Sequence, residues 1–235
     1  MAIRIVAALV LAAGIATAPA TAANLVTNGS FENASGFSPP ADNTMSLSSG
    51  ATTLTGWTVL GDALTWIGPA NPFSLTASDG SYFLDLTDYQ LGAPFGGVQQ
   101  SIATVSGHIY RVSFDLGSDV RTAVSSIDVS VGGPTQTFTS STPTVSDIWE
   151  SRTFDFAATS ASTILSLTGA VGSHYIGLDN IVVTDLGLAG AVPEPASWAL
   201  LIVGFGSIGA AMRRSPRRAG SGAPMDVDID LQIRQ

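Results

Sequence analysis

The middle of the chain, from Asn24 to about Leu186, carries a repeat of two residues, which is the repeat of an extended strand. Successive side chains of a strand point to opposite faces, so the segment Ile109–Leu116 places four apolar side chains on one face: Tyr110, Val112, Phe114 and Leu116. Ile127–Val131 alternates in the same way and ends at a glycine pair. Nothing in this region shows the spacing of an apolar helix stripe. The pattern therefore predicts antiparallel β-structure.

The same pattern marks seven candidate strands separated by turn residues. They are Ser81–Leu86, Val98–Thr104, Ile109–Leu116, Ile127–Val131, Trp149–Phe156, Thr163–Leu167 and Tyr175–Asp185. Many short strands at regular intervals are typical of a sandwich or jelly roll. We predict one all-β domain over residues 24–187, an antiparallel β-sandwich of the jelly-roll type.

The charge and the residue types exclude several function classes. The 235 residues include nine arginines, no lysine, no cysteine and 18 acidic residues. Between Asn24 and Val192 three arginines stand against fourteen acidic residues, a net charge of −11. Such a surface repels phosphate backbones, so nucleic acid is not an expected partner. Without cysteine, disulfides, thiolate catalysis and zinc–thiolate sites are excluded.

The first 23 residues have the organisation of a secretion signal. Arg4 supplies the positive charge, Ile5–Ile15 forms a short apolar run, and small residues at 20–23 offer a cleavage site. We expect a signal peptide over 1–23, cut after Ala22 or Ala23. The alternative is a retained membrane anchor, for which the apolar run is short.

A second apolar stretch lies near the C-terminus. After a linker at 188–195, residues 196–212 form an apolar run that would span about 25 Å as a helix, the low end of a membrane crossing. The arginines at 213, 214, 217 and 218 follow, and such clusters stay on the cytoplasmic side. We predict a transmembrane helix over 196–212 and a basic cytoplasmic tail over 213–235, with the domain outside. The alternative is a buried core helix.

The order of features in this tail resembles the PEP-CTERM sorting signal. The matching residues are Pro193, Glu194 and Pro195, then the apolar run, then Arg213, Arg214, Arg217 and Arg218. The resemblance implies an exosortase as partner, an intermediate inserted in the inner membrane, and delivery to the cell surface or to the extracellular matrix of a biofilm-forming bacterium. One departure is that residues 219–235 continue beyond the arginines.

The middle region also resembles the choice-of-anchor C group of exported bacterial proteins. The similarity lies in Asn24–Glu32, Ala77–Leu86, Gly96–Gln100 and Leu178–Ile181. The same order is similar to plant cell-wall domains built on the galactose-binding-like jelly roll. The resemblance implies that fold, which hosts many functions.

A structural calcium ion follows from the same resemblance. Galactose-binding-like domains often hold Ca²⁺ where the first and last strands meet. Glu32 follows the expected first strand and Asp179 lies in the last, and carboxylate oxygens are ligands that Ca²⁺ prefers. The alternative is that both carboxylates cap turns or accept hydrogen bonds from backbone amides.

Aromatic side chains suggest a carbohydrate surface. Trp66, Tyr82 and Tyr89 are the candidates for stacking on sugar rings, because aromatic faces are flat, apolar and electron-rich. Tyr89, in the expected loop Thr87–Gly97, is the strongest of the three. Trp57 and Trp149 are expected in the core instead.

Catalytic motifs are missing from the sequence, which has only two histidines, His108 and His174. We therefore predict a non-catalytic protein that binds extracellular polysaccharide. The alternative is a structural or adhesive envelope protein with no defined small ligand.

Overall fold

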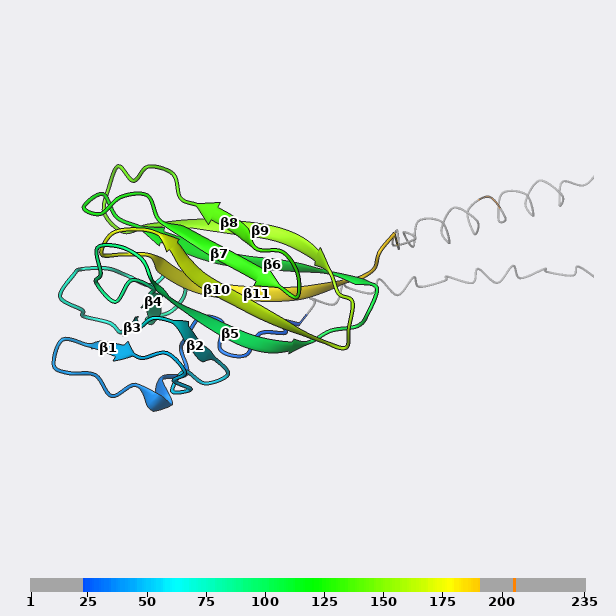
Figure 1. Ribbon diagram of the computed structural model, residues 1–235, viewed down its shortest axis with the longest axis horizontal. Coiled ribbons are helices and arrows are strands. Elements are labelled where there is room, and N and C mark those ends of the chain that lie inside the picture. The colour runs from blue at the N-terminus through cyan, green and yellow to red at the C-terminus, as the bar shows by residue number, and fades with distance from the viewer. Residues whose placement is uncertain (1–22, 191–204, 206–235) are drawn as a thin grey trace, which may run out of the picture. The chain divides into compact units, whose positions relative to one another are not determined.

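The computed structural model describes residues 23–190 and Phe205. Within these residues, eleven strands form two antiparallel sheets (Figure 1). The six-stranded sheet has the order β1 (Thr44–Leu47), β3 (Leu64–Ile67), β4 (Phe83–Asp85), β11 (Gly177–Leu188), β6 (His108–Ser118) and β9 (Ile148–Ala157). The five-stranded sheet has the order β2 (Thr58–Gly61), β5 (Gly96–Ala103), β10 (Ser162–Val171), β7 (Ser126–Val131) and β8 (Gln136–Thr139).

Helical structure within residues 23–190 is confined to one 3-10 turn, η1 (Ala34–Gly36). Across the described residues, no helix has both the length and the apolar character needed to cross a membrane. The predicted signal peptide, the predicted transmembrane helix at 196–212 and the basic tail lie outside the described residues, apart from Ala23 and Phe205.

The core forms where the inner faces of the two sheets meet. The alternating face of β6 is fully buried, with Val112, Phe114 and Leu116 at 0% exposure. It packs into one cluster with side chains of the other sheet, among them Ile127, Val129, Leu165 and Leu167. The predicted two-residue repeat is thus confirmed. It determines which side chains of β6 are buried in the core.

The strand expected before Glu32 is absent, since residues 23–31 form no strand and β1 begins at Thr44. The seven strands predicted after it are all present, and four more were not predicted. The four are β1, β2, β3 and β8, and each is only four residues long. Such short segments hold too few residues to show alternation, whereas β4, which is three residues long, lies within the longer predicted run Ser81–Leu86. In β3 every residue is buried, and in β8 only Phe138 is apolar, so neither pattern stands out in the sequence.

The two ends of the sandwich differ in what they carry. At one end the amide of Ala189 donates to the carbonyl of Gly107 (3.2 Å), so the last described residues lie beside the turn between β5 and β6. We call this the tail end. β11 starts at Gly177 and runs twelve residues to Leu188, about 40 Å of extended chain. Its start marks the opposite end, which we call the loop end.

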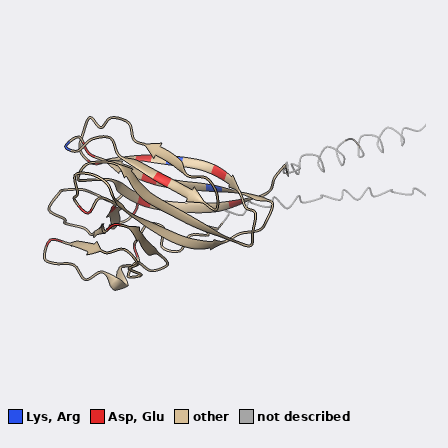
Figure 2. Ribbon diagram, viewed as in Figure 1, with Lys and Arg blue, Asp and Glu red and all other residues tan. Residues whose placement is uncertain are grey.

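Basic side chains are few and are neutralised locally. Arg111 pairs with Asp155, Arg121 with Asp119, and Arg152 with Glu150. Figure 2 shows the same distribution, with isolated basic positions near acidic ones. The described residues therefore present no broad cationic surface.

Candidate functional site

A hollow of about 390 Å³ opens at the loop end, and we call it the loop-end pocket. Its walls combine apolar and aromatic side chains with charged ones. The apolar and aromatic group is Ile67, Phe73, Leu75, Tyr89 and Tyr175, and the polar group is Asp85, Asp119, Arg121, Thr122 and His174. These residues come from four separate loops and from the ends of strands, so the pocket exists only in the folded chain.

The loops around the pocket hold backbone conformations that side chains usually avoid. Ser74, Asp88, Tyr89 and His174 all have positive φ, between 47° and 65°. Residues other than glycine seldom adopt this region, and when they do the surrounding contacts must hold them there. Such positions concentrate at binding sites, where strain fixes a side chain in place.

Tyr89 is the aromatic side chain at the mouth of the pocket. It is 37% exposed, and its ring lies 5.2 Å from that of Phe73 at an interplanar angle of 41°. Its amide donates to the hydroxyl of Thr87 (3.1 Å). Partial burial raises the pKa of Tyr89, so its hydroxyl stays protonated and able to donate.

An ion pair forms the polar wall. Asp119 is 1% exposed, and its two carboxylate oxygens accept from Nε and Nη2 of Arg121, both at 2.7 Å. This hydrogen-bonded guanidinium lowers the pKa of Asp119, which also accepts from the amide of Arg121. The Arg121 side chain remains 54% exposed. The pair thus holds a guanidinium in a defined orientation at the pocket.

Asp85 is a buried carboxyl beneath the pocket. It is 0% exposed, and its Oδ1 accepts from the amides of Thr87 and Ile176, both at 3.0 Å. Burial raises the pKa of Asp85 to about 6, against the effect of these amides. These bonds join the loop after β4 to the segment before β11, so Asp85 supports two walls of the pocket.

The three residues predicted to contact glycan lie in different surroundings in the structure. Only Tyr89 lines the loop-end pocket. Trp66 is fully buried, 4.9 Å from the ring of Phe37 and 5.9 Å from that of Tyr82, so the prediction that it offers a free face is wrong. The segment before β1 brings Phe37 over it. Tyr82 is partly buried in the same cluster and does not line the pocket.

Glu32 and Asp179 both bind the segment Ser78–Tyr82. Asp179 Oδ2 accepts from the amides of Ser78 (2.8 Å) and Asp79 (2.9 Å). Glu32 Oε1 accepts from the amides of Ser81 and Tyr82, both at 2.7 Å. Burial raises the pKa of Asp179 to about 7.

The hydrogen bonds of these two carboxylates bear on the calcium prediction. Both serve as acceptors for backbone amides, which is the alternative that the sequence left open. In the part of the chain that the structure describes, no group of three or more acidic, histidine or cysteine side chains is placed to hold a metal ion. Calcium binding at Glu32 and Asp179 stays a prediction.

Phe73, Arg121 and His174 are among the pocket residues that the sequence analysis did not identify as ligand contacts. Phe73 and Arg121 lie in loops with no motif, and His174 was considered only for catalysis. The one signal was the scarcity of arginine in the domain, where Arg121 is one of three. Their convergence depends on contacts between distant segments, which no local pattern records.

Comparison with known proteins gives two family matches. The model described as "Protein of unknown function (DUF642)" matches residues 24–175. The model of the PEP-CTERM protein-sorting motif matches residues 191–218, which confirms the resemblance found in the tail. Among curated proteins, halomucin of Haloquadratum walsbyi is 28% identical over 189 residues. The match covers 77% of this chain, which spans only 2% of that protein's length.

Solved structures to which the chain is similar include carbohydrate-binding modules. TmCBM61 in complex with beta-1,4-galactotriose is 20% identical, with 69% of this chain and 99% of that chain covered and a TM-score of 0.41. The CBM22-1 xylan-binding domain of Xyn10C from Paenibacillus barcinonensis is 18% identical, with coverages of 65% and 100% and a TM-score of 0.41.

Proposed function

The chain belongs to the DUF642 family of proteins of unknown function, and we propose a function for its domain. The domain binds extracellular polysaccharide at the loop-end pocket without catalysing a reaction. The PEP-CTERM motif indicates export and sorting toward the cell surface. A domain delivered there meets polysaccharide as an abundant polymer. The cell-surface destination of the chain and the chemistry of its pocket thus support the same function.

The observation that carries the proposal is the pairing of an aromatic wall with a polar one. The rings of Tyr89 and Phe73 line the same hollow as Arg121, whose guanidinium is oriented by Asp119 and also donates to the carbonyl oxygen of Phe73 (3.4 Å). A sugar ring has apolar C–H faces that stack on aromatic rings and hydroxyls that bond to charged and polar groups. A hollow of about 390 Å³ falls in the size range of small-ligand sites.

The position of the pocket also supports this function. The sorting motif starts at residue 191, directly after the tail end of the domain. The loop-end pocket lies at the other end of β11 from Leu188, about 40 Å away along that strand. A domain tethered through its tail end thus carries the pocket at the end far from the tether.

The acidic groups of the pocket favour binding over turnover. Asp119 is held by Arg121, and Asp85 accepts from the amides of Thr87 and Ile176. Nδ1 of His174 contacts the carbonyl oxygen of Tyr89 at 2.7 Å. Each of these groups already has a structural partner, whereas general acid–base catalysis needs a group within reach of the substrate proton.

For sorting, we propose that an exosortase recognises Pro193–Pro195 while residues 196–212 span the inner membrane and the arginines remain cytoplasmic. Mass spectrometry of the protein isolated from the cell surface tests this. We expect a C-terminus near the Pro-Glu-Pro motif. A surface protein that still ends at Gln235 would contradict processing.

The alternative function is structural or adhesive, with no small ligand. The similarity to a far longer curated protein, of which this chain spans 2%, is compatible with a module that serves in a large surface assembly. A structural or adhesive function requires no ligand in the loop-end pocket. The two functions therefore differ in whether substitutions in the loop-end pocket change retention on polysaccharide.

Affinity electrophoresis of the full chain separates them, in gels that contain the purified polysaccharide of the producing cell. We expect the wild-type chain to be retarded, and Tyr89→Ala and Arg121→Ala to lose about tenfold in affinity, equivalent to about 1.4 kcal/mol. The matched control is Leu91→Ala, since Leu91 is 73% exposed, two residues from Tyr89 and outside the pocket. Wild-type retardation of the Tyr89→Ala chain would refute the assigned site.

A further inference from the structure

A second hollow, of about 540 Å³, lies toward the tail end between β7 and β9, and we call it the edge groove. It exists because β8 is short. β8 pairs with β7 only from Ser126 to Val129, whereas β9 continues along β6 until Ala157 pairs with Ile109. Beyond the start of β8, the five-stranded sheet covers the inner face of β9 only in part.

The rings exposed by this gap belong to Phe154 and Phe156. Phe138 of β8 still packs on Phe154, with ring centroids 5.4 Å apart. Phe156 is supported from the core side by Tyr110, also at 5.4 Å and nearly parallel at 23°. Both phenylalanines are only partly buried. The protein thus holds two rings in place without covering them fully.

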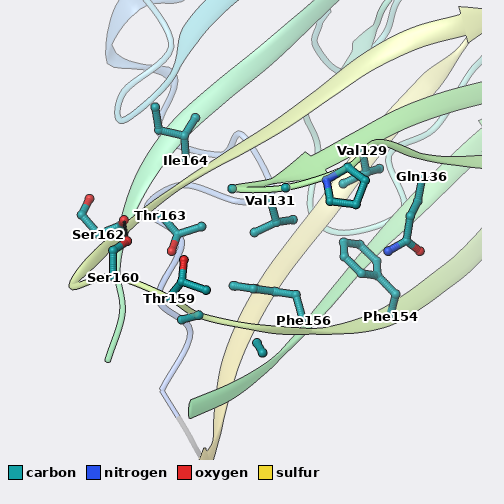
Figure 3. Close-up of a pocket in the computed structure, with 15 residues that line it drawn as sticks. Val129, Val131, Gln136, Phe154, Phe156, Thr159, Ser160, Ser162, Thr163 and Ile164 are labelled. Carbon is teal, nitrogen blue, oxygen red and sulfur yellow. Dashed lines mark hydrogen bonds between the residues drawn. The ribbon is translucent and has the colours of Figure 1, made fainter. Parts of the chain in front are cut away.

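The lining of the groove carries no charge. Fifteen residues line it, and none is acidic, basic or histidine, although the domain has fourteen acidic residues. In Figure 3 the two phenylalanines and Val131 occupy the middle, Gln136 lies toward one end, and Ser160 and Ser162 lie toward the other. The groove therefore combines an apolar floor with uncharged polar ends.

Two polar side chains at the groove are available to a ligand. Gln136 and Thr159 are exposed, and within residues 23–190 neither side chain makes a hydrogen bond. Other hydroxyls are engaged, since Thr163 bonds to Thr104 (2.9 Å) and Ser162 to Ser101 (2.8 Å). An amide and a hydroxyl can both donate to and accept from the hydroxyls of a sugar.

We propose that the edge groove is a second binding site, for an uncharged polysaccharide segment. The rings would stack on the apolar faces of sugar rings, while Gln136 and Thr159 bond to hydroxyls. An acidic polymer would find no cation in the lining and would meet the net negative charge of the domain. An acyl chain would remove the free polar groups from water without giving them partners.

This site acts independently of the loop-end pocket. Tyr175 lines that pocket and lies next to the start of β11. Ala158 lines the groove, and its amide donates to the carbonyl of His108. His108 pairs with Leu188 at the end of β11. The two sites therefore lie toward opposite ends of the sandwich. One chain can hold two segments of polymer at once, and paired sites raise retention on long polymers more than on short ones.

Calorimetry on the full chain with the Tyr89→Ala substitution, which weakens the loop-end pocket, tests binding at the groove. The probes are neutral hexasaccharides of glucose, mannose and xylose and the acidic hexamer of galacturonic acid. We expect one site per chain for at least one neutral hexamer and none for the acidic one. Combining Gln136→Ala with Thr159→Ala should weaken that binding at least fivefold, and Phe156→Ala should abolish it.

Controls keep a folding defect apart from a lost site. Gln136 and Thr159 are exposed and make no hydrogen bonds within the described residues, so their variants should melt like the parent chain. Thr153→Ala changes an exposed residue of β9 that does not line the groove and should leave binding unchanged.

Absence of binding by every neutral hexamer would overturn the proposal, as would equal binding of the acidic hexamer. A dimer that Phe156→Ala converts to monomer would assign the groove to a second copy instead. Gln136 and Thr159 lie outside the loop-end pocket, so weaker binding in their double variant assigns the calorimetric signal to the groove.

Discussion

Nδ1 of His174 lies 2.7 Å from the carbonyl oxygen of Tyr89, across 85 residues of sequence. The amide of His174 also donates to the carbonyl of the next residue, Gln90, at 2.8 Å. His174 and Tyr89 both have positive φ, 64° and 65°. The loop that presents the tyrosine ring is thus held by a histidine on another loop.

His174→Gly should separate ligand affinity from stability. Glycine adopts a positive φ without strain, so the melting temperature should change little. The imidazole contact with Tyr89 is lost, and we expect polysaccharide affinity to fall several-fold as the loop loosens. Affinity electrophoresis and thermal melting of the same sample measure both. Unchanged affinity would show that His174 does not position Tyr89.

Asp119→Ala should destabilise the domain. It removes a carboxylate that is 1% exposed and accepts from Arg121 and from the amide of Asp147. We expect a loss of about 1–2 kcal/mol in the free energy of unfolding, because the amides of Arg121 and Asp147 lose their acceptor, whereas the guanidinium of Arg121, which is 54% exposed, can bond to water. Urea denaturation measures the loss. The control is Asp155→Ala, which breaks a solvent-exposed pair with Arg111 and should cost little.

Stability should fall as the pH rises above about 4. Burial raises the pKa of Asp85 to about 6 and that of Asp179 to about 7, from the ordinary aspartate value of 3.8. The folded state therefore binds more protons than the unfolded state between pH 4 and 7, and stability decreases through this window. We expect Asp85 to contribute on the order of 3 kcal/mol and Asp179 on the order of 4 kcal/mol.

Below that window the trend should reverse. The pKa values of Asp119, Glu150 and Asp155 are lowered by their arginine partners, although burial opposes this at Glu150, so protonation of these groups costs stability in acid. Urea denaturation at a series of pH values should thus show a maximum between about pH 4 and 5. A stability that climbs steadily from pH 4 to 8 would contradict the raised pKa values.

Gly117→Ala should be poorly tolerated, because a Cβ there would lie 2.7 Å from the hydroxyl oxygen of Tyr175 and 2.9 Å from the Cα of Gly177. Overpacking of this kind costs about 1–3 kcal/mol. Gly92→Ala is the matched control, since nothing lies within 4 Å of its added Cβ. Thermal melting of the two variants compares them directly. Equal melting temperatures would show that Tyr175 moves aside easily.

Melting in EDTA and in calcium tests the metal prediction for Glu32 and Asp179. Coinciding melting curves would show that the backbone amides alone satisfy both carboxylates and would contradict the metal prediction. A calcium-dependent rise in melting temperature that Glu32→Gln removes would instead establish the site that the family resemblance implies.

The sequence by itself determined the β-class, seven of the eleven described strands and the sorting motif. Each is a local property: alternation is visible within β6, and the motif is read within one short segment. Tyr89 was also found this way, because a loop and an aromatic residue are both local features. The family resemblance likewise identified Glu32 and Asp179 as a pair, and the structure joins both to one segment, Ser78–Tyr82.

Only the tertiary structure decided what surrounds these residues. It buried Trp66 beneath Phe37, and it brought Phe73, Arg121 and His174 to Tyr89 from three other loops. It also opened the edge groove, since the gap arises from the unequal lengths of β8 and β9 in different sheets. The physical reason is that strand periodicity follows from backbone geometry within a few residues, whereas a pocket depends on contacts between segments that only folding brings together.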